Sequence, residues 1–289
     1  MGALAMSVFE TPDPISATLD LAVAGVRIVA SDRSDTVVEV RPSNRSRGAD
    51  LKAVDQTRVE YANGRLSVRM AKEWTRYTPF GGTASVDITI ELPTGSQVHG
   101  VSEMGSYDID GRLEECTIRT GAGSVRLDRT GPLTVNTGIG EIFAHRIAGD
   151  AELKTGSGQV TAGVIDGAAV VRNGNGVTRL GEVGGDLRVK SANGDIIVAR
   201  AQKSVVAKSA NGTVRVAHAQ SGTVVLETAA GEIEVGIPEG TAAFLDVKTH
   251  FGNVRSSLQA STASEPSRST VEVRARTSYG DIVITRAPA

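Results

Sequence analysis

The side chains best suited to recognition chemistry gather in one short segment. Trp74, Tyr77 and Phe80 lie close together, although the chain contains only one Trp, four Tyr and five Phe. Arg76 lies among them, and clustered aromatic residues with arginine are typical of contact hot spots. We interpret the segment either as a partner-contact or ligand-contact loop, or as a hydrophobic plug that folds over one end of the core.

Residues capable of catalysis or metal binding are scattered. The only cysteine, Cys116, can form no internal disulfide, and we expect it to be a small buried residue. The four histidines have no metal-ligand spacing and are expected on the surface or in turns: His99, His145, His218 and His250. We therefore predict no catalytic residue, no metal site and no cofactor.

An internal repeat dominates the sequence from residue 105 onward. Glycines recur first at intervals of 17 or 18 residues and then at intervals of 19, 21 and 28 residues, at positions 105, 123, 140, 158, 176, 194, 212, 231, 252 and 280. Most of these marker glycines close a polar tetrad such as Thr155-Gly-Ser-Gly158 or Ser191-Ala-Asn-Gly194. Such tetrads are typical of turns, because Gly and Asn tolerate positive φ.

Apolar residues keep register with these glycines. At two and at four positions after the glycine, nine of the ten residues are apolar, and the residues between them are mostly polar. A second alternating pair follows in each full repeat, for example Leu187 and Val189. Alternation with period two predicts a strand with one buried face. No segment shows the 3.6-residue period of a helix.

Two short strands cannot bury their apolar faces alone, so equivalent strands are expected to stack coil upon coil. The sequence therefore predicts an all-β fold: a single-chain β-solenoid of about 18 residues per coil. The usual crossover preference favours a right-handed coil. We expect Asn175, Asn193 and Asn211 to stack as a structural amide ladder at one turn.

A repeated structure of this kind also allows a test for enzymatic sites. Residues one repeat apart stack, so an active site should show carboxylates in neighbouring coils. At the position after the marker glycine, no two consecutive repeats both carry a carboxylate. The paired acids of a polysaccharide-cleaving enzyme are thus missing from this column.

The ends of the chain lack the regular repeat. We predict a disordered tail over residues 1–14, a β-strand region over 15–100 that caps the solenoid, and solenoid repeats over 101–286. A polar stretch at 258–270 is expected to be a mobile insertion. Uncovered terminal coils would expose strand edges and permit self-association.

Charge and hydropathy exclude several classes of protein. With 31 basic and 33 acidic residues the net charge is −2, which gives no electrostatic footprint for nucleic acid. No run approaches the ~20 apolar residues of a membrane-spanning helix. The first ten residues carry neither basic side chains nor a long apolar run, so we expect a cytoplasmic protein with no membrane insertion.

The motifs resemble those of a known family. Val86-Asp-Ile-Thr-Ile-Glu-Leu-Pro-Thr-Gly95, followed by repeats such as Leu153-Lys-Thr-Gly-Ser-Gly-Gln-Val160, is similar to bacterial β-strand-repeat proteins of unknown function, often labelled putative adhesins. The resemblance covers nearly the whole chain. It implies a β-solenoid without an established enzymatic activity, and it transfers no site residues.

Three functional hypotheses follow. The first is a non-enzymatic scaffold or protein-interaction module with an unknown protein partner. The second is a carbohydrate-binding or polysaccharide-active protein that uses a solenoid face or the Trp74 segment. The third is a self-assembling polymer formed through exposed terminal coils.

Overall fold

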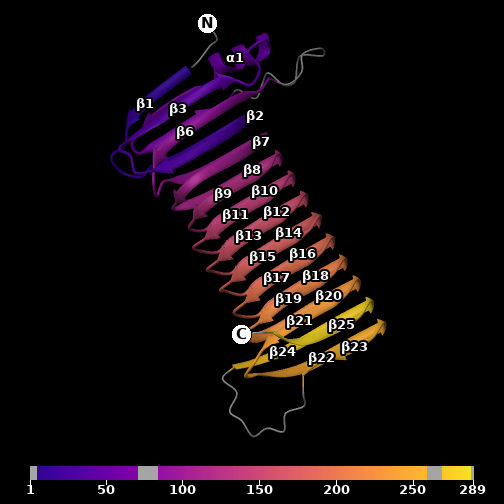
Figure 1. Ribbon diagram of the computed structural model, residues 1–289. Coiled ribbons are helices and arrows are strands. Elements are labelled where there is room, and N and C mark those ends of the chain that lie inside the picture. The colour runs from indigo at the N-terminus through magenta and orange to yellow at the C-terminus, as the bar shows by residue number, and fades with distance from the viewer. Residues whose placement is uncertain (1–4, 71–83, 259–268, 288–289) are drawn as a thin grey trace. The chain divides into compact units, whose positions relative to one another are not determined.

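The computed structural model describes residues 5–70, 84–258 and 269–287. The chain divides into two compact units, residues 1–145 and 146–289. Apart from one short helix, the regular structure of the described residues is β-strand (Figure 1). The all-β fold class that the alternation predicts is therefore confirmed.

The first unit begins with strands that do not follow the glycine repeat and ends with strands that do. In chain order its elements are β1 (Ala5–Glu10), β2 (Ser16–Ser31), β3 (Asp35–Pro42), α1 (Gly48–Gln56), β4 (Arg58–Ala62), β5 (Arg65–Arg69), β6 (Val86–Pro93), β7 (Gln97–Leu113), β8 (Glu115–Ala122), β9 (Val125–Thr130) and β10 (Leu133–Ile139). Strand β11 (Ile142–Ile147) runs through the division between the units.

Strand β7 is long enough to form a whole coil. Its first half pairs in parallel with β8, and its second half pairs in parallel with β9. Strand β2 pairs with β7 from Ser16 to Ala30, and it also pairs with β5 and β6. The region 15–100 therefore supplies complete coils of the solenoid in addition to a cover.

Antiparallel strands and the helix cover the first coil. Strand β3 pairs antiparallel with β6, β1 pairs antiparallel with β3, and β4 pairs antiparallel with β5. Helix α1 contacts β3 and β6 and buries Asp50, Ala53 and Val54. The predicted N-terminal β-sheet cap is thus confirmed.

Two local expectations in this cap are wrong. Residues 5–10, assigned from sequence to a disordered tail, form strand β1, because β3 offers them an antiparallel partner across the whole strand. The expectation of no helix fails at α1, which has only nine residues. A helix of that length is too short to show a clear period, and it gains its stability by packing on the sheet.

The second unit consists of stacked coils, each built from two strands. Its strands are β12 (Ala151–Ser157), β13 (Val160–Ile165), β14 (Ala169–Asn175), β15 (Thr178–Val183), β16 (Leu187–Asn193), β17 (Ile196–Ala201), β18 (Val205–Asn211), β19 (Val214–Ala219), β20 (Gly222–Ala230), β21 (Ile233–Pro238), β22 (Thr241–Phe251), β23 (Val254–Ser256), β24 (Ser269–Tyr279) and β25 (Ile282–Ala287).

Equivalent strands of successive coils pair in parallel. Ala151 pairs with Ala169, and Ala169 pairs with Leu187, so the register advances by 18 residues per coil. The marker glycines lie at the turns, and Gly194 has a φ of 133°. A Cβ atom on Gly194 would lie 2.1 Å from the carbonyl oxygen of Gly176 in the preceding coil. The glycine repeat is therefore a requirement of the stacked turns.

The core of the second unit consists of inward columns of small and medium apolar side chains. One column is fully buried and holds Leu153, Val171, Val189, Ala207 and Leu226. The facing sheet contributes Val160, Ile196, Val214, Ile233 and Ile282, which are also fully buried. This narrow interior explains the low aromatic content of the chain.

The last two coils do not stack in the order of the sequence. Strands β24 and β25 pair with β20 and β21 on one side and with β22 and β23 on the other. The expectation that each segment stacks on the one before it is wrong here. In β25, the two inward residues Ile282 and Ile284 are both apolar and buried. In β23, the residue aligned with Ile284 is Ser256, and this more polar strand lies at the edge.

The predicted mobile insertion at 258–270 overlaps this connection. Residues 259–268 lie outside the described residues, and Ser269 and Thr270 begin strand β24.

Candidate functional site

The second unit carries a row of basic side chains on the outer face of one sheet. At one outward position, successive strands in the order β12, β14, β16, β18, β20, β24 and β22 align their residues by direct pairing. We call this set the basic row; it consists of Lys154, Arg172, Lys190, Lys208, Glu227, Arg276 and Lys248. Six of its seven members are cationic, in a chain with a net charge of −2.

Alternation explains why these side chains face outward. Inward neighbours such as Leu153 and Val189 fill the core, so the intervening residues point away from it. Parallel strands lie about 4.8 Å apart, so cationic groups recur along the solenoid at that interval. A single surface thus gathers charges from segments as far apart in the chain as Lys154 and Arg276.

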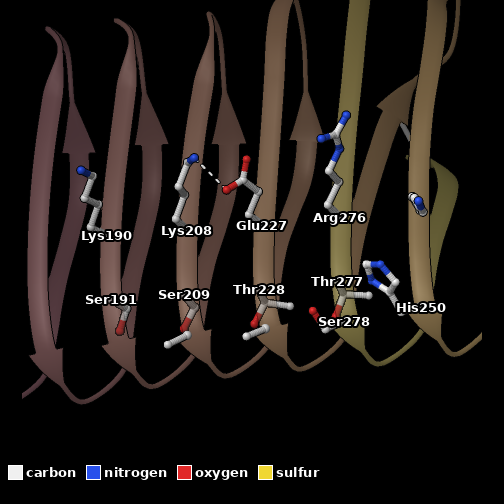
Figure 2. A pocket seen from close by; sticks show the side chains of 13 residues that line it. Lys190, Ser191, Lys208, Ser209, Glu227, Thr228, His250, Arg276, Thr277 and Ser278 are labelled. Atoms are coloured by element: carbon white, nitrogen blue, oxygen red, sulfur yellow. Dashed lines mark ion pairs between the residues drawn. The ribbon is translucent and has the colours of Figure 1, made fainter.

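A hollow of about 700 Å³ lies along the row from β16 to β22. Figure 2 shows Lys190, Lys208, Glu227 and Arg276 on one level of the sheet, with Ser191, Ser209, Thr228 and Thr277 on a level nearer the turns. The small side chains of Ala210 and Ala229 also line the hollow and leave it open beside the long basic side chains.

The basic row is only partly neutralised. Lys208 Nζ lies 2.7 Å from Glu227 Oε2, and an Arg276 guanidinium nitrogen lies 3.4 Å from Asp246 Oδ2. Lys190 and Lys248 form no ion pair with any residue that the structure describes. Exposed ion pairs contribute little to stability, so a carboxylate of a ligand could replace Glu227 or Asp246 at small cost.

The hydroxyl groups at the base of the hollow mainly hold the turns. Ser209 Oγ donates to the carbonyl of Gly194 at 3.3 Å, and Thr228 Oγ1 donates to that of Gly212 at 3.0 Å. Thr277 Oγ1 donates to the carbonyl of Gly231 at 3.1 Å. Ser191 Oγ is buried without a hydrogen-bond partner among the described residues. These contacts fix the backbone beneath the basic row.

The three asparagines singled out from the sequence lie in one column at the turns. Asn193 Nδ2 donates to Asn175 Oδ1 at 2.8 Å, and Asn211 Nδ2 donates to Asn193 Oδ1 at 2.8 Å. Their side chains thus bond to one another from coil to coil. Asp195 directly follows the marker glycine Gly194, and its Oδ1 accepts a hydrogen bond from the backbone N–H of Thr213 in the next coil at 2.8 Å. Both interactions tie neighbouring coils together.

Trp74, Arg76, Tyr77 and Phe80 lie outside the described residues. Both interpretations of this segment therefore stay predictions.

Cys116 is fully buried in the first unit, as expected of a small core residue. Burial raises the pKa of its thiol to about 12, so the thiol stays neutral and unreactive near neutral pH. Among residues 5–70, 84–258 and 269–287, no three His, Cys, Asp or Glu side chains gather at distances suited to a metal ion.

Sequence reasoning missed the basic row, although part of its signal is visible. A basic residue precedes the polar tetrad in Lys154-Thr, Arg172-Asn, Lys190-Ser and Lys208-Ser, once in each repeat. Arg276 and Lys248 could not be added from sequence, because their order in the row depends on the exchange of the last two coils.

A family model described as Toastrack DUF4097 matches residues 17–285. The chain belongs to this family. The Toastrack match extends over the cap and the repeats alike, which confirms the resemblance to an adhesin-like β-strand-repeat family. No curated protein matches the sequence. No described helix is long and apolar enough to cross a membrane.

Several solved structures are similar to this Toastrack chain. A putative adhesin from Parabacteroides distasonis has 14% identity and a TM-score of 0.46, over 98% of this chain and 97% of the other. A putative adhesin from Parabacteroides merdae has 10% identity and a TM-score of 0.45, over 97% and 96%. A putative lipid binding protein from P. distasonis has 12% identity and a TM-score of 0.36, over 97% of each chain.

Proposed function

We propose that this Toastrack protein is a non-enzymatic interaction module that binds an acidic segment of a partner protein along the basic row. The observation that carries the proposal is the alignment of six cationic side chains, four of which line an open hollow. Lysine and arginine recognise carboxylates through charge-assisted hydrogen bonds. Their repetition from coil to coil suits an elongated ligand better than a small substrate.

Glu227 shows how a carboxylate fits this surface. It is the only acidic member of the basic row, and its Oε2 lies 2.7 Å from Lys208 Nζ. Arg276 and Lys190 lie on either side of this pair along the row (Figure 2). An acidic segment laid along the row would extend the same interaction to Lys190 and Lys248.

Rigidity favours the binding role. Each coil is bonded to its neighbours through the backbone, the Asn ladder and turn contacts such as that of Thr228. The backbone positions that carry the cationic side chains are therefore fixed before a partner arrives, which lowers the entropic cost of binding.

Fluorescence anisotropy with a labelled acidic peptide of about a dozen Glu and Asp residues tests the proposal. We expect saturable binding that weakens with added salt, and roughly tenfold weaker binding by a Lys190→Glu, Lys208→Glu double variant. The matched control is Arg179→Glu, Arg200→Glu, which changes the same charge on strands β15 and β17 of the other sheet. No binding, or an equal loss in both variants, would contradict the proposal.

The carbohydrate hypothesis, which uses a solenoid face or the Trp74 segment, stays a prediction. A glycan array that compares the wild type with Trp74→Ala would test it. The cytoplasmic location is likewise a prediction, which cell fractionation would test.

A further inference from the structure

The C-terminal end of the second unit exposes residues of the core columns. Leu245 aligns with Val273 and Val224 in the coils behind it, and those two are 0% exposed, whereas Leu245 is 39% exposed. Val254 aligns with Ile282, and their exposed fractions are 45% and 0%. The sequence supplies apolar residues at these positions, but no described strand lies beyond them.

Strands β22 and β23 also have an unpaired backbone edge. Strand β22 pairs only with β24, and β23 pairs only with β25, among the described strands. The N–H and C=O groups of β22 that point away from β24 offer a template for another strand. Exposed apolar side chains on this end include Phe244 and Phe251, and the ring of Phe251 stacks on Tyr279 at 5.0 Å.

The charge pattern of this edge is complementary to itself. Asp246 and Lys248 flank Val247 and face outward, on the side opposite the core column. If two copies of β22 pair antiparallel about Val247, Asp246 of each copy lies opposite Lys248 of the other. Opposite charges directly across an antiparallel pair are stabilising, and like charges are destabilising. The same two-fold arrangement places Leu245 of each copy beside Thr249 of the other and covers both open cores.

We propose that two copies of this chain associate through β22 to form a closed two-fold dimer. Such an interface is isologous, because each copy uses the same patch, and so the association stops at two copies. This differs from the polymer that the sequence suggests. A polymer formed by pairing β22 with β1 is disfavoured, because β1, with the sequence Ala-Met-Ser-Val-Phe-Glu, has no cation to match Asp246.

Charge exchange between variants tests this geometry directly. In sedimentation velocity over a wide concentration range, we expect a monomer–dimer equilibrium for the wild type. Asp246→Lys places Lys opposite Lys at both symmetric contacts, and Lys248→Asp places Asp opposite Asp. Each variant alone should dimerise roughly tenfold more weakly or not at all. An equimolar mixture of the two should regain a dimer, because every contact in the mixed pair is then between opposite charges.

The matched control is Glu152→Lys. Glu152 occupies the same outward column as Asp246 and pairs with Arg172 at 3.0 Å, as Asp246 pairs with Arg276, but it lies far from the terminal edge. This variant should dimerise like the wild type. Leu245→Lys places a charge on the side of the open core. Introduced alone, or into both members of the mixed pair, it should abolish dimers.

A wild type that stays monomeric at every concentration, larger oligomers without a dimer, or single variants that are not rescued by mixing would overturn the proposal. Lys248 belongs both to the paired strand and to the basic row, whereas Lys190 and Lys208 lie outside the paired strand. The dimer test uses no peptide, and the Lys190→Glu, Lys208→Glu double variant tests peptide binding without changing β22. A wild type that dimerises but binds no acidic peptide would therefore contradict only the proposed function.

Discussion

The two ends of the solenoid solve the same structural problem in different ways. At the N-terminal end of the first unit, antiparallel strands and α1 cover the coil formed by β5 and β6, and Ala53 and Val54 are buried there. At the C-terminal end of the second unit, β22 and β23 form the last described coil, with Leu245 and Val254 substantially exposed. One end is closed by the chain itself, and the other is left with an unpaired edge.

Both ends nevertheless share one device. In each, a segment from elsewhere in the sequence is inserted between two coils: β2 lies between β6 and β7, and β24 lies between β20 and β22. The inserted strand is paired on both sides, and at the C-terminal end the coil that carries Ser256 in place of Ile284 takes the outside position. The two ends therefore differ in what covers the outside strand: β3 pairs with β6 at the N-terminal end, whereas no described strand covers β22 at the C-terminal end. A partner strand can therefore bind at β22.

The largest expected effect on stability is that of truncating a buried leucine inside the solenoid, and the same truncation at the open end serves as its comparison. Leu226→Ala in β20 removes a fully buried side chain and is expected to lower the free energy of unfolding by about 3 kcal/mol. Leu245→Ala in β22 should lower it by about 1 kcal/mol, because the side chain is already partly exposed. Urea denaturation of monomeric samples measures both values. Equal losses would mean that the open end is covered in solution.

A smaller loss is expected from the polar contacts of the closed end. Asp50 is buried, accepts hydrogen bonds from the backbone N–H groups of Ser85 at 3.2 Å and Asn44 at 3.1 Å, and lies 3.7 Å from Arg47. Asp50→Ala should cost about 2 kcal/mol, because these donors lose their acceptor. The control Asp55→Ala, at an exposed position of α1, should change stability by less than about 0.5 kcal/mol. A negligible effect of Asp50→Ala would show that α1 does not hold the cap.

The smallest effect concerns the pH dependence of the closed end. The hydrogen bond from Arg33 lowers the pKa of Asp35 below its usual value, and Arg33 also pairs with Glu91. Because the folded pKa is the lower one, this stabilisation is present above the unfolded pKa of about 3.9 and is lost as the pH falls through the folded value.

Asp35→Asn should therefore be slightly less stable than the wild type at neutral pH, and the difference should vanish in acid. Asp246→Asn is the matched change at the open end, where the partner Arg276 is exposed. Chemical denaturation of both variants across acidic and neutral pH measures the two differences. A difference for Asp35→Asn that grows in acid would contradict the assignment.

The sequence was sufficient for the repeating part of the fold. The marker glycines and the apolar columns predict the solenoid, because positive φ and the close approach to the preceding coil leave little choice at positions such as Gly194. The cap was less predictable. Strand β1 and helix α1 are short, and they depend on contacts with β3 and β6 that are distant in sequence.

The candidate site was visible only in part. The basic residues before each tetrad recur in the sequence, but their significance depends on how many coils align and in which order. That order changes at β24, since Ile284 competes better than Ser256 for the buried position. A competition between two segments for one coil is a tertiary effect, and periodicity alone does not reveal it.

Hydrogen exchange measured by mass spectrometry at several protein concentrations tests the contrast between the two ends most directly. Amides of β6 should be protected at every concentration, because both edges of that strand are paired. Amides of β22 that point away from β24 should exchange quickly in dilute samples and become protected as the concentration rises. Strong protection of β22 at the lowest concentration would contradict the contrast, because the edge would then already be covered within one copy.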